Sequence, residues 1–224
     1  DGSTLSDFEL RSFFALLFPA GAETTTRSIS GGMLAFIEHP EQWLRLRDER
    51  ELIKPSVEEI VRWTPPSVYK GRTATRAVKF RDKTIHPGDK VTVWEMSANR
   101  DEREFDEPFR FDIGRSPNRH LGFGAGVHFC LGSQLARLEL RILLEELVKH
   151  VRHIESAGDP VWTANNRLVG LKSLPGTIWL ASGARAEGRS EGKVASARGS
   201  PQRSKKNDYT RRFYEPMAIM VTDG

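Results

Sequence analysis

The chain has 224 residues, of which 38% are hydrophobic, enough to form a globular body of one large or two small domains. It carries 34 Lys and Arg against 30 Asp and Glu, a formal net charge of +4, and its single cysteine excludes an internal disulfide. The sequence has neither a run of about 18 apolar residues nor a secretory leader pattern, so it predicts a cytoplasmic protein that does not span a membrane.

The surplus of positive charge lies in residues 183–224, which contain nine Lys or Arg and five Asp or Glu. Residues 1–182 are therefore neutral. The 183–224 segment is rich in Ser, Gly, Ala and Arg without apolar periodicity, and we expect a basic, disordered tail. A charge of +4 without a helix that fits a groove is a weak basis for nucleic-acid binding, which we do not expect.

A long helix is predicted first. Ser6 or Asp7 precedes apolar residues at helical spacing, and the pattern continues to Ile37, where His39-Pro40 ends it. Pro19 lies inside this helix, and we expect it to kink the helix and make its middle irregular.

The remaining elements are predicted from periodicity, β-branched composition and turn signals. They are, in chain order, helices over 40–50 and 55–63, a small antiparallel sheet over 67–94, a loop-rich stretch over 98–129, an amphipathic helix beginning at or beside Cys130 and continuing to about Val151, and a strand over 173–181. The fold class is thus mainly α with small antiparallel β-sheets.

The lone cysteine stands in the glycine-rich segment FGAGVHFCLG, residues 123–132. The glycine spacing does not match a dinucleotide-binding loop, and nearby histidines do not have zinc-site spacing. A thiolate at a helix N-terminus suits a nucleophile or an iron ligand equally well. From this segment alone, Cys130 could also be a small core residue.

Four motifs together resemble the cytochrome P450 family of haem-thiolate monooxygenases, soluble bacterial type. Phe123-x-x-Gly126-x-x-x-Cys130-x-Gly132 resembles the family's cysteine-ligand loop. In the family's order, the other three are AGAETT at 20–25, similar to the oxygen-activation stretch of the central helix, EEIVR at 58–62, and the meander-like segment SANRDEREFDEPFRFDIGR at 97–115.

The resemblance implies a bound haem b, iron protoporphyrin IX. Cys130 would be the metal ligand, and Arg72 and His128 would pair with the haem propionates. Phe123 would shield the sulfur, and Gly126 and Gly132 would let the backbone approach the porphyrin.

The same resemblance assigns catalytic and structural roles. Glu23 and Thr24 resemble the acid–alcohol pair that delivers protons during oxygen activation. Glu59 and Arg62 resemble the family's buried ion pair, tied to a meander arginine. We expect that arginine to be Arg110, with Arg115 as the other candidate.

Substrate contacts are implied at two places. Leu17, Ala20 and Gly21 would face the distal side of the haem, and the segment after the second short helix would line the pocket. That segment comprises Pro65, Pro66, Ser67 and Val68, and residues 165–174 correspond in position to the family's C-terminal pocket loop.

The resemblance covers about residues 3–182 and matches the C-terminal half of a full-length member, so we expect the N-terminal half of the domain to be absent. The implied function is insertion of one oxygen atom of dioxygen into an apolar organic substrate, with electrons from a ferredoxin and its reductase. The alternative is a truncated gene product that at most binds haem and has no turnover.

Overall fold

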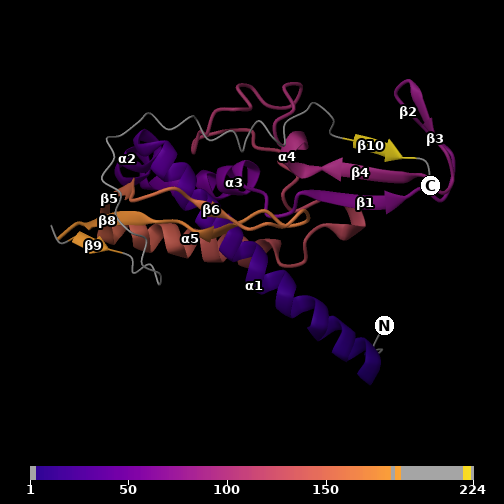
Figure 1. Cartoon of the computed structure of the whole chain (residues 1–224), viewed down its shortest axis with the longest axis horizontal. Helices are drawn as coiled ribbons and strands as arrows, with labels where there is room; N and C mark the ends of the chain where they lie inside the picture. The colour runs from indigo at the N-terminus through magenta and orange to yellow at the C-terminus, as the bar shows by residue number, and fades with distance from the viewer. Residues whose placement is uncertain (1–3, 183–184, 188–218, 223–224) are drawn as a thin grey trace.

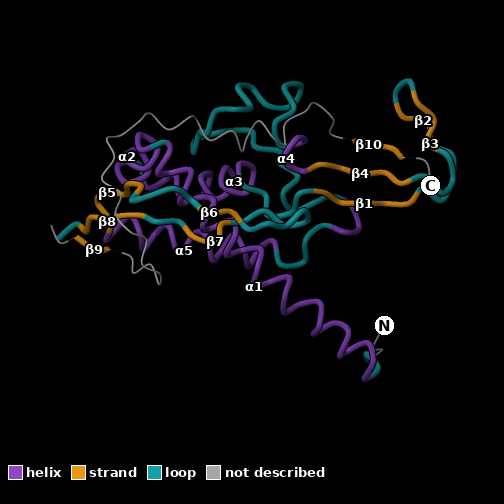
Figure 2. The backbone as a smooth tube through the Cα atoms, viewed as in Figure 1, coloured by secondary structure: helices purple, strands orange, loops and turns teal. Residues whose placement is uncertain are grey.

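A computed structural model describes residues 4–182, 185–187 and 219–222 of the chain. The helices α2, α3 and α5 and a sheet of β5, β8 and β9 form one end of the molecule, and a sheet of β1, β4 and β10 forms the other (Figure 1). The first half of α1 projects away from both (Figure 1). The fold class is mainly α with small antiparallel sheets, as the sequence predicts (Figure 2).

The long helix α1, Asp7–Glu38, begins with a capping box in which Ser6 and Glu9 satisfy each other's backbone N–H groups. It ends before His39, because Pro40 starts the next helix. The helix is unbroken through Pro19, so the irregular middle that the sequence suggested is absent.

The shorter helices frame the core. They are α2 (Pro40–Asp48), the 3-10 turn η1 (Arg50–Leu52), α3 (Ile53–Trp63), α4 (Glu95–Ala98) and α5 (Ser133–His150). Helix α3 begins two residues before Pro55, which a helix tolerates in its first turn. Among the described residues, no helix is both long and apolar enough to cross a membrane.

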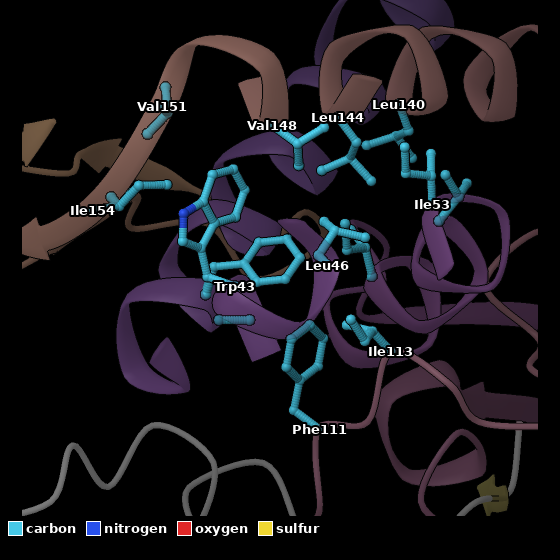
Figure 3. Close-up of a cluster of buried hydrophobic side chains, with 14 of the residues drawn as sticks. Trp43, Leu46, Ile53, Phe111, Ile113, Leu140, Leu144, Val148, Val151 and Ile154 are labelled. Carbon is cyan, nitrogen blue, oxygen red and sulfur yellow. The ribbon is translucent and has the colours of Figure 1, made fainter. Parts of the chain in front are cut away.

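The core lies between the second half of α1, α2, α3, α5 and strand β5 (Val151–Ser156). Trp43, Leu46 and Leu144 are all buried and point toward one another (Figure 3). Phe36 of α1 packs edge-on against Trp43 and Phe111, with ring centroids 5.4 and 5.6 Å away. These aromatic contacts join the loop after α4 to the helical core.

The region predicted as one small sheet forms two. β1 (Tyr69–Thr73) pairs antiparallel with β4 (Lys90–Trp94), while β2 (Val78–Phe80) and β3 (Lys83–Ile85) form a separate hairpin. At the other end β5 pairs with β8 (Gly176–Leu180), which lies in the predicted 173–181 strand, and β6 (Val161–Trp162) pairs with β7 (Leu171–Ser173).

Two short strands fall within the segment 183–224, for which the sequence predicts disorder. β9 (Arg185–Glu187) pairs with β8, and β10 (Ile219–Thr222) pairs with the edge of β4 that β1 leaves free. The expectation does not hold for these two strands, because each finds an open sheet edge to extend. The rest of that segment lies outside the described residues.

Two glycines of α1 differ in what an added methyl group would meet, and this predicts opposite effects on stability. Gly21 is exposed with open space around it, so Gly21→Ala should stabilise the chain by about 0.5–1 kcal/mol through helix propensity. A Cβ at Gly32 would lie 2.9 Å from Ile60, so Gly32→Ala should destabilise it by about 1–3 kcal/mol. Urea unfolding followed by circular dichroism measures both, and a stabilising Gly32→Ala would contradict the close packing of α1 on α3.

Candidate functional site

Cys130 lies on an exposed loop directly before α5. Its N–H donates to the carbonyl of Phe123 at 2.9 Å, which closes the loop on itself. Gly124 and Gly126 have φ of +73° and +67°, a conformation that side chains rarely adopt. Helix α5 begins at Ser133 with Gly132 as its N-cap, so the cysteine precedes the helix rather than starting it.

The surroundings of the thiol are apolar and open. Val127, Phe129 and Leu131 are 99%, 49% and 79% exposed, and an added Cβ at Gly126 or Gly132 would meet nothing within 4 Å. The described residues contain no group of three His, Cys, Asp or Glu that could hold a bare metal ion. One soft sulfur donor on an open apolar surface fits a flat ligand that brings the remaining metal ligands itself, as a porphyrin does.

The two residues expected to contact propionates are also exposed. Arg72 lies on β1 and donates to the carbonyl of Gly71 at 2.8 Å. His128 lies in the 3-10 turn η2 (Gly126–His128), two residues before the cysteine. Both side chains are exposed at the surface.

The expected acid–alcohol pair lies in the middle of α1. The Thr24 hydroxyl donates to the carbonyl of Ala20 at 2.7 Å, and Glu23 lies 3.6 Å from Arg27 in an ion pair. Thr25, which the sequence analysis did not single out, is buried where α1 meets the body. Leu17, Ala20 and Gly21 are exposed on the same helix.

A cavity of about 860 Å³ lies between β1, the end of β4 and the loop at 164–166. Its lining residues are Val68, Tyr69, Trp94, Ala164, Asn165 and Asn166. Val68 and the 165–174 segment are therefore brought together, and Ser67 forms a β-bridge with Leu168 beside them. The residues predicted on α1 do not line this cavity.

The pair Glu59 and Arg62 is fully buried in α3. Arg62 donates from Nε and Nη2 to the two carboxylate oxygens of Glu59 at 2.7 and 2.8 Å. Its three remaining N–H groups have backbone carbonyls as partners, those of Asn99, Pro108 and Arg110, at 2.8–3.0 Å. All five guanidinium donors are thus satisfied by groups within the protein.

The meander arginine tied to this pair is Arg115, so the expectation of Arg110 is wrong. Nε of Arg115 lies 3.3 Å from Glu59, and its other nitrogens donate to three carbonyls, those of Asp106, Glu107 and Arg110. Arg110 instead turns outward, 56% exposed, and pairs with Glu107. It contributes to the cluster through its carbonyl, a role that side-chain identity does not reveal.

Three polar residues beside the cysteine loop, Glu58, His120 and Arg137, were given no role by the sequence analysis, which considered His120 only as a zinc ligand and rejected it. Glu58 accepts hydrogen bonds from His120 and from Arg137. Burial raises the pKa of Glu58, but the hydrogen bonds from His120 and Arg137 and the charge of Arg137 outweigh it and lower the pKa to about 2. The only sequence signal was a second glutamate next to Glu59.

Comparison with known proteins places this architecture in one family. The model for cytochrome P450 matches residues 1–179, and the chain belongs to the cytochrome P450 family. It is 54% identical over 174 residues to cytochrome P450 126 of Mycobacterium tuberculosis, covering 78% of this chain and 42% of that protein. It is 45% identical over 179 residues to a methyl-branched lipid omega-hydroxylase of the same species, covering 79% and 42%.

Similarity to solved structures supports the same family assignment. The cytochrome P450 PksS of the Bacillus subtilis bacillaene polyketide synthase superposes with a TM-score of 0.74 at 42% identity, covering 78% of this chain and 46% of that one. P450BioI, in complex with an acyl carrier protein ligated with hexadec-9Z-enoic acid, gives 0.76 at 39% identity, covering 79% and 46%. The chain thus spans less than half the length of these relatives.

The different positions of the two meander arginines predict different effects on stability. Arg115→Met should destabilise the chain by about 1–3 kcal/mol, because a buried carboxylate and three carbonyls lose a charged donor. Arg110→Met should change stability by less than about 0.5 kcal/mol, because its side chain is at the surface. Equal losses in urea unfolding, or a larger loss for Arg110→Met, would contradict this assignment.

Proposed function

We propose that this chain supplies the haem-thiolate part of a monooxygenase that inserts one oxygen atom of dioxygen into an apolar organic substrate. The observation that carries the proposal is Cys130, the only cysteine of the chain, exposed on a glycine-rich loop before α5 in a member of the cytochrome P450 family. We place this activity in the cytoplasm, where ferredoxins and their reductases supply electrons.

The cofactor we propose is haem b. Cys130 would ligate the iron, Arg72 and His128 would pair with the propionates, and Phe123 with the loop glycines would support the ring on the side of the sulfur. When bound, haem iron activates dioxygen, and a thiolate ligand favours cleavage of the oxygen–oxygen bond. The open apolar surface around the thiol supports this fit.

Glu23 and Thr24 are proposed to deliver protons at the oxygen-binding side. The hydroxyl of Thr24 is held by the carbonyl of Ala20, so its oxygen has a fixed position from which it can accept and pass on a proton. Glu23 is held loosely by Arg27 at 3.6 Å and is 53% exposed, so it can exchange protons with solvent. The two neighbouring side chains could therefore form a short relay.

The substrate we propose is a molecule with a long apolar portion. The support is the cavity lined by Val68, Tyr69 and Trp94, in which the two amides of Asn165 and Asn166 offer hydrogen bonds to a polar end. A relative is named as a methyl-branched lipid omega-hydroxylase, and a related structure was solved with an acyl carrier protein bearing a fatty acid. We extend that substrate class to this chain.

The electron donor is proposed to dock on the face of the cysteine loop. A groove of about 380 Å³ between α3 and α5 is lined by Lys54, Arg137 and Arg141 together with Glu58. Three cations against one carboxylate suit an acidic ferredoxin, which such charges steer to the surface.

The rest of the haem pocket is proposed to come from the half of the fold that this chain does not span. The first turns of α1, the loop before α5 and α5 itself expose large apolar side chains, among them Phe8, Phe14, Phe18, Leu131 and Leu135, each at least 60% exposed. An exposed apolar area of this kind marks a surface that another polypeptide segment covers.

Haem binding tests the proposal directly. The whole chain is mixed with haemin, reduced and treated with carbon monoxide, alone and co-expressed with the part of the Mycobacterium tuberculosis relative that it does not match. We expect the red-shifted Soret band of a thiolate ligand in the co-expressed sample, and its loss in Cys130→Ser. No such band in either sample, or a band that the substitution leaves unchanged, would reject the proposal. A band without product formation would favour the alternative of a haem-binding chain without turnover.

The proton relay has a matched control on the same helix. Thr26 makes the same bond as Thr24, its hydroxyl donating to the carbonyl of Ala22 at 2.9 Å, and both threonines are on α1. In the co-expressed sample, Thr24→Ala should lower the product formed per electron pair supplied by roughly tenfold or more. Thr26→Ala should leave it unchanged, and an equal fall in both variants would contradict the assignment.

A further inference from the structure

Glu58 joins three separate parts of the chain. It lies on α3, and its carboxylate accepts from Nε2 of His120 at 3.0 Å. The guanidinium of Arg137 on α5 donates to both of its oxygens, at 2.7 and 2.9 Å. The three side chains are 28%, 3% and 27% exposed, so the cluster is mostly sheltered from water and its bonds are stronger than surface ion pairs.

The ring of His120 is held by hydrogen bonds on both sides. Its Nδ1 accepts from the N–H of Gly122 at 3.2 Å, so that nitrogen carries no proton. The proton is therefore on Nε2, which donates to Glu58. The imidazole of His120 thus bonds a loop amide on one side and a carboxylate on the other.

Arg137 reaches the cysteine loop through Phe123. Its guanidinium carbon lies 4.4 Å from the centroid of the Phe123 ring, a cation–π contact, and the ring of His120 packs against Phe123 with centroids 5.8 Å apart. The carbonyl of Phe123 in turn accepts the N–H of Cys130. The cluster and the cysteine are thus linked through one aromatic residue.

The same stretch of loop lies tightly against α3 and against Asn99, the residue that follows α4. The N–H of Leu121 donates to Asn99 at 2.7 Å, and a Cβ at Gly122 would lie 2.6 Å from Val61. The start of the loop therefore has little room to move toward α3, whereas its outer part, from residue 125 onward, is exposed. These contacts hold the backbone at Leu121 and Gly122, but they do not determine the orientation of the Phe123 ring.

We propose that Glu58, His120 and Arg137 are positioning residues that clamp Phe123 between α3 and α5 and so set the position of Cys130. They act through Phe123 rather than on any ligand. The importance of the clamp for oxygen chemistry rests on the proposed function, but the clamp itself is a property of the ligand-free chain.

The test uses hydrogen exchange of the whole chain without haem, read on peptides that cover residues 120–131. Glu58→Gln and Arg137→Gln should each speed exchange of the Gly122 and Cys130 amides about tenfold, because charged hydrogen bonds are lost from both sides of Phe123. Arg141→Gln is the matched control: Arg141 lies one turn later in α5, lines the same groove and pairs, within the described part of the chain, with Glu145 at 3.6 Å. It should leave the loop unchanged.

Further measurements separate positioning from general stability. The double variant Glu58→Gln/Arg137→Gln should exchange about as fast as either single variant, because each already breaks the shared cluster. Arg137→Lys keeps the charge without the planar fork and should restore protection only in part. Exchange in β5 and β8 should not change. In the haem-loaded, co-expressed protein, Glu58→Gln and Arg137→Gln should lower the fraction of thiolate-type Soret band, and Arg141→Gln should not.

Loop exchange that is the same in Glu58→Gln, Arg137→Gln and Arg141→Gln would overturn the proposal. So would faster exchange throughout the chain, since that would mean loss of global stability. Because these results come from the ligand-free chain, they stand whether or not haem binds. A clamp that holds in a chain without a thiolate-type Soret band would contradict the proposed function and leave the clamp intact.

Discussion

The carboxylate of Glu59 and the guanidinium of Arg62 are both fully buried, so each must find all its partners inside the protein. Removing two charges from water costs several kcal/mol per ion. The attraction between the two ions offsets this cost only when further hydrogen bonds satisfy both groups. Those bonds come from the segment between α4 and the cysteine loop: three carbonyls around Arg62, and the N–H of Asp112 and the amide of Asn118 around Glu59. A long stretch without regular structure is thereby given a defined path, because moving it would leave a buried charge unpaired.

That path leads to the cysteine. Asn99 illustrates the link, since its carbonyl accepts from Arg62 while its side-chain oxygen accepts the N–H of Leu121 at the start of the loop. The neighbouring residue Glu58 points to another side of α3, because successive helical residues are about 100° apart, and there it meets His120 and Arg137. One helix thus organises the meander with one glutamate and the cysteine loop with the next.

The sequence predicts correctly the elements whose signals lie within a short stretch of the chain. Spacing along the chain predicts the helices around α3 and the pairing of Glu59 with Arg62. It also predicts a loop at the glycines before Cys130. It failed where the choice is made by packing: Arg110 and Arg115 are equivalent in sequence, and only the fold turns one outward and the other toward Glu59. The split of the 67–94 region into a sheet and a separate hairpin, and strand β10 on the edge of β4, likewise depend on contacts between distant residues.

The two sides of the proposed haem site differ in how firmly contacts within this chain hold them. The loop that bears Cys130 is tied to α3 through the hydrogen bond from His120 to Glu58 and to α5 through the contact of Phe123 with Arg137, so its shape depends on residues of this chain. The middle of α1, with Glu23 and Thr24, is joined to the body mainly through its second half, from Thr25 onward, and its first turns expose apolar side chains to water. The part of the fold that this chain does not span should therefore matter more for the oxygen side of the site than for the sulfur side. A thiolate-type haem complex would then require less of the half that this chain does not span than turnover does, since ligation depends on the loop and oxygen chemistry on a closed pocket.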